Sequence, residues 1–162
     1  MEVKERMGAV KKARSKHNVD ITPEGKERRT VNGITFDSEE EACYYEEVVL
    51  KDPSITSYKT QPKYLLQEGF QKYGRKFNPV YYEADFEIER GLEITVVDVK
   101  GMPTETANLK RKLFDKRYPD KLLEWVAYSR LDGGWVQYDE LKKLRKERKK
   151  AKEKAAKAKL II

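Results

Sequence analysis

Two apolar runs on either side of Gly91 predict a β-hairpin, and this hairpin limits the possible folds more than any other part of the chain. The runs read VYYEADFEIE (80–89) and LEITVVDVKG (92–101), with Arg90-Gly91 between them. Branched and aromatic residues favour strands, and glycine suits the turn. The second run is apolar enough to be covered on both faces, so the hairpin requires helices packed against its sheet.

The segments around the hairpin supply the other elements of such a layered fold. Asp37 or Ser38 suits the N-cap of the first predicted helix, and Leu109, Leu113 and Phe114 are expected to be buried in the second. The order of helix, three strands, helix and strand predicts an α/β fold in which a mixed sheet is flanked by helices. We expect helices over 37–50 and 104–118, strands over 31–36, 57–67, 80–89, 92–101 and 122–129, and a polar turn over 68–76.

Basic charge is concentrated at the two ends of the chain. Residues 1–30 contain nine Lys/Arg against five Asp/Glu, and residues 139–162 contain eleven against four, whereas residues 31–138 contain fifteen against nineteen. We therefore expect a flexible or partner-ordered basic arm over 1–30, a compact domain over 31–138 and a Lys-rich helix or tail over 139–162. A basic end can bind polyphosphate or aid solubility, and a charge run alone favours solubility.

The small number of cysteine and histidine residues excludes several kinds of site. Cys43 and His17 are each the only residue of their kind, which rules out an intrachain disulfide and a zinc site built on His and Cys. The same scarcity argues against Ser-His or Cys-His catalysis. No apolar run approaches the roughly 20 residues of a membrane span and no signal-peptide pattern opens the chain, so we expect an intracellular protein without a membrane partner.

Charged residues interrupt the apolar pattern of both hairpin strands. Asp85 lies in the first strand, and Asp98 and Lys100 lie two residues apart in the second, so the latter two share one face. Pairing through the turn near Gly91 would bring Asp85 beside Asp98. Neighbouring carboxylates repel, and a hard cation such as Mg²⁺ keeps both ionised, with the Val99 carbonyl as a possible third oxygen ligand.

Lys100 next to such a site could orient an attacking water or stabilise developing negative charge. The simpler interpretation is a solvent-facing hairpin in which Lys100 pairs with Asp98. The apolar Val96-Val97 ahead of Asp98 favours the first interpretation, because charge at the end of a buried strand is typical of a functional site.

The sequence ADF at 84–86, followed by VVDVKG at 96–101, resembles the motif of the PD-(D/E)XK nuclease superfamily. Asp85 matches the first acid, Asp98 the second and Lys100 the lysine. The segments FDSEEEACYYEE, TQPKYLLQ and NLKRKLF stand in the order typical of small phage-encoded members, which are related in architecture to Holliday-junction resolvases. The resemblance covers roughly 31–129. It departs from the motif at Ala84, where proline is expected, and at Asp98, where glutamate is more frequent.

The resemblance implies a restriction-endonuclease-like core and a further acid from the first helix. Glu41 is the preferred candidate for a metal ligand, with Glu40 and Glu46 as competitors. The pattern Ser38-x-x-Glu41 is equally typical of a helix capping box, so both interpretations of Glu41 stay open.

Residues around the hairpin could contact nucleic acid. Gln61 on the adjacent strand could line the site, and Lys110 and Lys112 could bind phosphate, although a solvated basic helix face explains the lysines as well. Tyrosines are numerous enough to stack on bases, although aromatic residues in strands more often belong to the core. They are Tyr44, Tyr45, Tyr64, Tyr73, Tyr81 and Tyr82.

The motif match implies a Mg²⁺- or Mn²⁺-dependent endonuclease acting on DNA. The small size of the chain favours structure-selective cutting, as by a homodimeric resolvase that acts on branched DNA. If the chain is phage-encoded, we expect it in the cytoplasm of a bacterial host. Two other classes stay open, namely a non-catalytic nucleic-acid-binding protein and a small interaction protein with a solubilising tail. The implied metal ligands are Asp85, Asp98, Val99 and Glu41, with Lys100 as the residue that positions the nucleophile.

Overall fold

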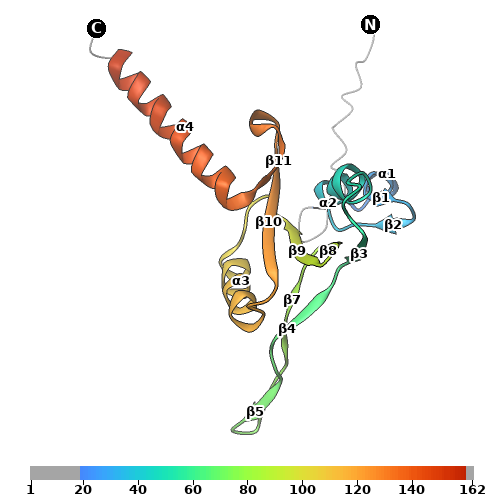
Figure 1. Cartoon of the computed structure of the whole chain (residues 1–162). Helices are drawn as coiled ribbons and strands as arrows, with labels where there is room; N and C mark the ends of the chain where they lie inside the picture. The colour runs from blue at the N-terminus through green and yellow to red at the C-terminus, as the bar shows by residue number, and fades with distance from the viewer. Residues whose placement is uncertain (1–18, 160–162) are drawn as a thin grey trace, which may run out of the picture. The chain divides into compact units, whose positions relative to one another are not determined.

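The computed structural model describes residues 19–159. The chain divides into two compact units at the boundary between Glu46 and Glu47. Figure 1 shows the helices and strands described below. Residues 1–18 of the predicted basic arm, and the last three residues of the predicted tail, lie outside the described residues.

The first unit contains a helix that the sequence pattern did not predict. Helix α1, Pro23–Arg28, begins at the N-cap Thr22, whose hydroxyl accepts a hydrogen bond from the Gly25 backbone N–H at 3.1 Å. Proline in the first turn has a backbone angle suited to a helix start. Residues 23–28 of the predicted basic arm are therefore helical, and the arm as a separate part of the chain stays a prediction.

A small hairpin and a capped helix complete the first unit. Strands β1, Thr30–Val31, and β2, Ile34–Thr35, pair antiparallel around Asn32-Gly33, where both residues have positive φ. Helix α2, Glu39–Tyr44, passes into a π-helical turn, η1, Tyr45–Val49, so the helix predicted over 37–50 begins two residues later and changes its hydrogen bonding.

The second unit is built on a five-stranded mixed sheet with the strand order β11-β10-β9-β8-β3. The β3–β8, β8–β9 and β10–β11 pairs are antiparallel, whereas β9 and β10 are parallel and are connected through α3. The predicted α/β class with a mixed sheet and flanking helices is confirmed. The strands are β3, Ser57–Thr60; β8, Phe86–Arg90; β9, Glu93–Val99; β10, Leu122–Ser129; and β11, Gly134–Gln137, the last of which was not predicted.

The strand predicted over 57–67 is broken at Gln61-Pro62, and the strand predicted over 80–89 is broken at Ala84-Asp85. Their outer halves form a separate ribbon, in which β4, Lys63–Gln67, pairs antiparallel with β7, Val80–Glu83. Proline cannot donate to a sheet ladder, which explains the first break.

The polar turn predicted over 68–76 is a third hairpin, which corrects the sequence prediction. Strands β5, Phe70–Lys72, and β6, Arg75–Phe77, pair around Tyr73-Gly74 (Figure 1). The whole stretch 67–79 is exposed. Because neither face is buried, the sequence lacks the alternation of apolar and polar residues that predicts a strand.

Helix α3, Glu105–Arg117, covers the face of the sheet that carries Val96 and Trp125. Its anchor is Phe114, which is fully buried in the core cluster. The predicted burial of Leu109 and Leu113 is wrong, since these side chains are 58% and 38% exposed. The inward face of α3 is marked instead by the buried Phe114 and the half-buried Ala107, Lys110 and Arg111, at the spacing of three to four residues that one helix face requires.

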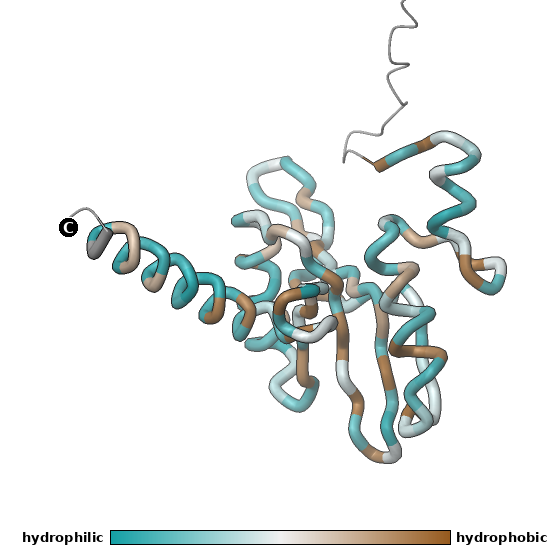
Figure 2. The backbone as a smooth tube through the Cα atoms, turned by 90° about the horizontal axis from the view of Figure 1, so that it is seen from above, coloured by the Kyte–Doolittle hydropathy of each residue, from teal (hydrophilic) through white to brown (hydrophobic). Residues whose placement is uncertain are grey.

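The predicted Lys-rich helix is confirmed as α4, Tyr138–Lys159. Its first turn is anchored by Leu141, which is fully buried, and the rest is hydrophilic along most of its length (Figure 2). Within residues 19–159, no helix is both long and apolar enough to cross a membrane.

Candidate functional site

Asp85 and Asp98 lie across from each other at the end of the β8–β9 hairpin. The strands pair antiparallel with Phe86 opposite Val97, and continuing this register by one residue places Asp85 opposite Asp98. The Asp85 carboxylate accepts a hydrogen bond from the Val99 backbone N–H, with 2.6 Å between Oδ2 and N. The main chain between Asp98 and Lys100 therefore positions the Asp85 carboxylate.

Lys100 joins this pair of acids. Its Nζ lies 2.8 Å from Oδ1 of Asp98, a carboxylate that is 2% exposed, while the lysine side chain itself keeps 26% of its surface exposed. A buried carboxylate requires a partner charge or several hydrogen-bond donors to stay ionised. Lys100 supplies that charge, and its side chain stays partly exposed.

Tyr82 and Trp125 complete the surroundings of Asp98; Tyr82 was predicted only as a base-stacking or core tyrosine, and Trp125 was not predicted as a site residue. The Tyr82 hydroxyl donates to Oδ2 of Asp98 at 2.5 Å, and Trp125 Nε1–H donates to the Tyr82 oxygen at 2.7 Å. Trp125 stands beside Asp98 in the parallel β9–β10 register. Oδ1 of Asp98 is thus held by Lys100, which directly follows the same strand, and Oδ2 by Tyr82 of β7, which Trp125 of β10 holds in turn, so the orientation of the carboxylate is fixed.

The charge of Asp98 is reflected in its tyrosine neighbour. Burial raises the pKa of the Tyr82 hydroxyl, and the negative charges of Asp98 and, more weakly, Asp85 raise it further. Tyr82 therefore remains a protonated donor throughout the pH range in which the protein would work.

Replacing Tyr82 by phenylalanine tests this network. Tyr82→Phe removes one hydroxyl and leaves Asp98 Oδ2 and Trp125 Nε1 buried without that partner, so we expect a loss of about 1–3 kcal/mol in the free energy of unfolding, measured by urea denaturation. The matched control is Tyr81→Phe, at an exposed position on the other face of the strand. An unchanged urea midpoint for Tyr82→Phe would show that the network does not support the fold.

Three consecutive basic residues, Lys110, Arg111 and Lys112, lie on α3, and Arg111 is the one that packs on Trp125, the neighbour of Asp98. Its guanidinium lies 4.5 Å from the centroid of the Trp125 ring and forms a 2.7 Å ion pair with Asp139. The hydrogen bond from Arg111 lowers the pKa of the Asp139 carboxyl. Lys110 is half-buried and Lys112 exposed on the same helix, and phosphate binding by either stays a prediction. The spacing of three residues between Arg111 and Phe114 is the signal that could have identified Arg111.

Gln61 lies directly beside Asp85 through its main chain. Its backbone N–H donates to the Asp85 carbonyl at 2.8 Å, and the Asp85 N–H donates to the Val97 carbonyl at 3.1 Å. Gln61 has a φ of 50°, a backbone conformation that residues other than glycine rarely adopt. The structure thus brings Gln61 to the acid pair as a backbone support, while its side chain is exposed.

Glu41 lies in the first unit, where its carboxylate closes the predicted capping box. Ser38 Oγ and the Asp37 N–H donate to its two oxygens at 2.8 and 3.1 Å, and the Glu41 N–H donates back to Ser38 Oγ. The structure therefore confirms the capping interpretation. The predicted metal role of Glu41 stays a prediction, as do those of its competitors Glu40 and Glu46.

The donor set of the hairpin site consists of oxygen atoms. The carboxylates of Asp85 and Asp98 and the main-chain carbonyl of Val99 are hard ligands of the kind that Mg²⁺ and Mn²⁺ prefer. Among the described residues there is no group of three or more His, Cys, Asp and Glu side chains arranged to hold a metal ion. A cation held only by these two carboxylates and one carbonyl would have to keep several waters, as Mg²⁺ does, and its binding stays a prediction.

Glu87 provides an internal comparison for Asp98. It is a second buried carboxylate on the same sheet, and it too is held by a lysine and a tyrosine, since Lys59 Nζ lies 2.6 Å from Oε1 and the Tyr64 hydroxyl donates to Oε2. Burial works to raise the pKa of Glu87, but the hydrogen bonds from Lys59 and Tyr64 lower it below its usual value. Glu87 has the same kind of partners as Asp98 but lies outside the proposed ligand set.

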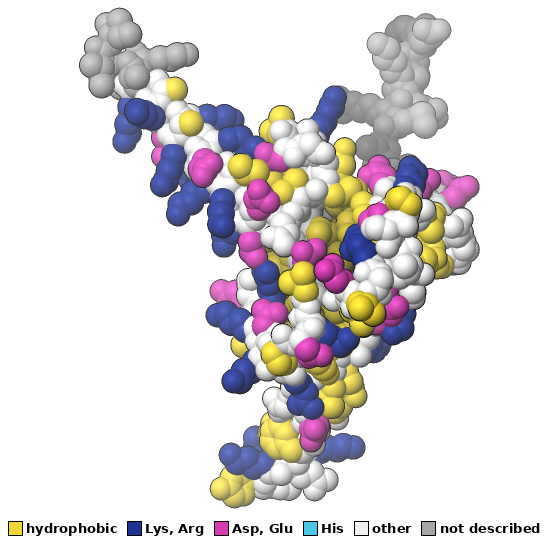
Figure 3. Space-filling view, in the orientation of Figure 1, with side chains coloured by type: hydrophobic (Ala, Val, Ile, Leu, Met, Phe, Trp, Pro, Cys, Tyr) yellow, Lys and Arg dark blue, Asp and Glu magenta, His cyan; other side chains and the backbone are white. Residues whose placement is uncertain are grey.

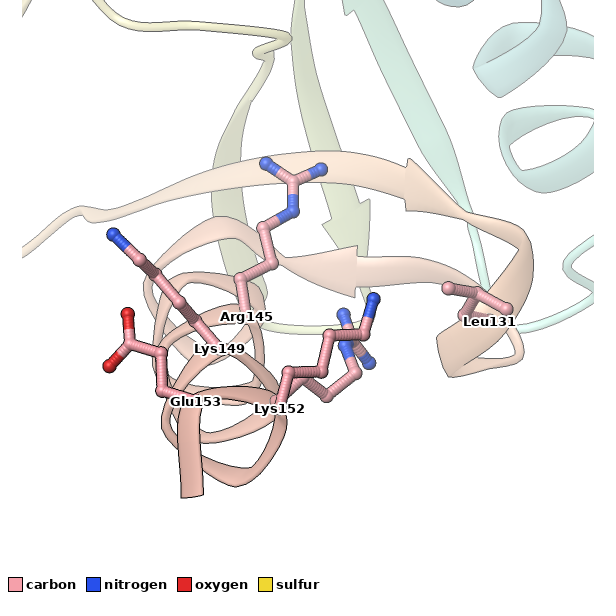
Figure 4. Close-up of a pocket in the computed structure, with 6 residues that line it drawn as sticks. Leu131, Arg145, Lys149, Lys152 and Glu153 are labelled. Atoms are coloured by element: carbon pink, nitrogen blue, oxygen red, sulfur yellow. The ribbon is translucent and has the colours of Figure 1, made fainter. Parts of the chain in front are cut away.

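Basic side chains also gather along α4, as Figure 3 shows. A cavity of about 460 Å³ lies between this helix and the turn η2, Arg130–Asp132 (Figure 4). Arg148 on its wall is bound to Asp132 through two nitrogens, at 2.5 and 3.0 Å. Phosphate binding here remains a prediction. The lining residues are Leu131, Arg145, Arg148, Lys149, Lys152 and Glu153.

The fold and the hairpin together define an α/β protein with two aspartates and a lysine gathered at the end of its central strands. Residues 24–132 match a family described as "Protein of unknown function (DUF1064)", which is more than half of the chain. The chain belongs to the DUF1064 family. The matched region contains Asp85, Asp98 and Lys100 and ends before α4. A search of curated proteins and a search of solved structures each found no match.

Proposed function

We propose that this chain is a metal-dependent endodeoxyribonuclease that hydrolyses DNA phosphodiester bonds. The observation that carries the proposal is the arrangement around Asp98, a buried carboxylate held by Lys100 at 2.8 Å with a second carboxylate, Asp85, bound to the next residue along the strand. Ionised groups are costly to place at the end of an apolar strand, and such an arrangement is typical of a functional site.

The connectivity of the sheet supports the same proposal. Strands β3, β8 and β9 are consecutive antiparallel neighbours, α3 follows, and β10 then returns parallel to β9. This is the order of elements expected for a restriction-endonuclease-like core. Asp85 directly precedes β8, Asp98 lies in β9 and Lys100 directly follows β9, so the three residues come together at one end of this strand pair.

The roles of the residues follow from their geometry. Asp85, Asp98 and the Val99 carbonyl would hold Mg²⁺ or Mn²⁺, which when bound would activate a water and polarise a phosphoryl oxygen. Tyr82 and Trp125 fix the Asp98 carboxylate so that it does not rotate away. The Lys100 ammonium, partly exposed beside Asp98, would stabilise the negative charge that develops at the phosphoryl group.

The likeness of the motif to that of junction resolvases favours branched DNA as the substrate. Paired nicks across a four-way junction require two active sites, so we propose a homodimer for that reaction. This part of the proposal depends on the likeness to junction resolvases and not on a contact of the described residues.

A cleavage panel tests the proposal and the metal requirement together. With Mg²⁺ or Mn²⁺ the purified protein is expected to cut a labelled four-way junction in preference to linear duplex, flap and single strand, and excess EDTA is expected to stop cleavage because the acids cannot act without the cation. The products are read on denaturing gels. Equal rates on all four substrates would remove the preference for junctions.

Cleavage that persists in EDTA would overturn the metal-dependent mechanism. DNA binding without cleavage under any metal condition, together with no calorimetric signal for Mn²⁺, would instead identify a non-catalytic nucleic-acid-binding protein. The two results are separable because binding is measured in EDTA and cleavage in metal.

A further inference from the structure

A two-stranded ribbon extends from the sheet of the second unit (Figure 1). The β4–β7 pair forms its base and the β5–β6 hairpin its end, and residues 67–79 are exposed throughout. Isolated two-stranded hairpins are marginal in water, and this one is held by a stacked pair of directly opposed rings, Phe70 and Phe77, with centroids 4.6 Å apart. Both rings remain 42% exposed.

The tip of the ribbon has an unusual residue in its turn. Tyr73 and Gly74 connect the strands with φ of 48° and 72°, the pattern of a two-residue type I′ turn. The first position of that turn favours Asn, Asp or Gly, because a large side chain with positive φ is strained. Tyr73 is nevertheless placed there, and it is 95% exposed. An exposed aromatic residue with a strained backbone does not stabilise the fold. Its presence at this position therefore indicates a function.

Basic residues surround this tyrosine. Lys72 and Arg75 are opposite each other at the end of the ladder, and Lys76 follows in β6. The Lys72 ammonium lies 5.7 Å from the Tyr73 ring centroid. Figure 3 shows hydrophobic and basic side chains together at the end of the ribbon. An exposed ring among cations is the combination that binds unstacked bases and the phosphates next to them.

We propose that the β5–β6 hairpin is a DNA-contacting arm in which Tyr73 stacks on an unpaired base or an exposed end of a base stack. Lys72, Arg75 and Lys76 contact the adjacent phosphates. The arm therefore selects DNA with unstacked bases, such as branch points and single strands, over continuous duplex. This inference takes DNA as the ligand from the proposed function. The chemistry of the arm adds the preference for unstacked bases.

The substitution Tyr73→Asn separates recognition from folding. Asparagine is favoured at this turn position, so the variant is expected to be at least as stable as the natural chain in urea denaturation. Its affinity for a labelled single strand and for a four-way junction, measured by fluorescence anisotropy in EDTA, is expected to fall about five-fold to a hundred-fold, as the loss of one stacking contact implies. Affinity for linear duplex is expected to change less. The matched control is Tyr128→Asn, at a tyrosine that is 52% exposed outside the ribbon.

Neutralising the arm tests the phosphate contacts. The triple change Lys72→Gln, Arg75→Gln and Lys76→Gln is expected to reduce the slope of log affinity against log salt, by about 0.7 per lost contact on a single strand. The control changes Lys51 and Lys116, two exposed lysines outside the ribbon and outside α4, to glutamine, and is expected to leave the slope nearly unchanged. Unchanged affinity of Tyr73→Asn for single strand and junction would overturn the proposal. The proposal would also be overturned if the substitutions in the hairpin weakened binding to anionic lipid vesicles and left the affinity for DNA unchanged.

The outcomes for the arm and for the nuclease are distinguishable. If the natural chain binds DNA through the hairpin but does not cleave it in metal, the arm is supported and the nuclease proposal fails. If the natural chain and Tyr73→Asn cleave and bind alike, the nuclease is supported and the arm is refuted.

Discussion

Asp98→Asn is expected to abolish DNA cleavage while leaving DNA binding largely intact. The amide keeps the size of the side chain but removes the charge that would hold the cation and that pairs with Lys100 at 2.8 Å. Loss of a metal ligand removes several kcal/mol of transition-state stabilisation, so the cleavage rate is expected to fall by at least about a hundred-fold. The measurement is the single-turnover rate on a four-way junction in Mg²⁺, with junction affinity measured separately in EDTA. Lys100→Ala is expected to act in the same direction.

Glu87→Gln is the matched control for Asp98→Asn. Glu87 is also a buried carboxylate with a lysine and a tyrosine as partners, on the strand next to β9. If loss of a buried charge merely disturbed the sheet, both variants would lose cleavage in proportion to their loss of stability. Retention of cleavage by Glu87→Gln, with its loss in Asp98→Asn, would assign the effect to the site. Full activity of Asp98→Asn would remove the basis of the proposed mechanism.

Phe114→Ala is expected to be the most destabilising single substitution of α3. Phe114 is fully buried, and its ring packs on Tyr64, Tyr82 and Tyr118 with centroid distances of 5.0, 5.3 and 5.1 Å. Removing a phenyl ring from such a core costs about 3–5 kcal/mol, because transfer energy is lost and a cavity remains. Urea denaturation followed by circular dichroism measures the effect. Since the Tyr82 ring would lose a neighbour, cleavage is also expected to decline.

Leu109→Ala serves as the control on the same helix. Its side chain is 58% exposed, so the change is expected to alter stability by less than about 1 kcal/mol. Equal losses for the two variants would mean that α3 packs through a different face from the one described. The comparison thus tests the phase of the helix as well as the size of the core.

The central hairpin could be predicted from sequence because its signal is local. Alternating apolar residues defined the strands, and the turn at Gly91 set a register in which Asp85 falls opposite Asp98. Lys100 follows on the same face two residues later, and its 2.8 Å contact with Asp98 needs only the geometry of one strand. The mixed sheet followed from the order of the elements.

Other features were missed because their signals were weak or absent. The β5–β6 hairpin is exposed on both faces, so no apolar alternation marked it, although Phe70 and Phe77 stand symmetrically about Tyr73-Gly74. In α3, Leu109 and Leu113 were expected to be buried because they are apolar. The inward face of the helix passes instead through Phe114 and Arg111. The phase of a helix is decided by what it packs against, and that surface comes from other strands.

The sequence by itself determined the acid pair, the lysine beside it and the α/β class, because each depends on neighbours within one hairpin or on the order of elements. Only the tertiary structure decided how Asp98 is held, since Tyr82 and Trp125 come from other strands, 16 and 43 residues from their hydrogen-bond partners. It likewise decided that Arg111 and not Leu109 faces inward. Contacts between distant segments depend on the packing of the whole sheet, and no local pattern of residues contains that information.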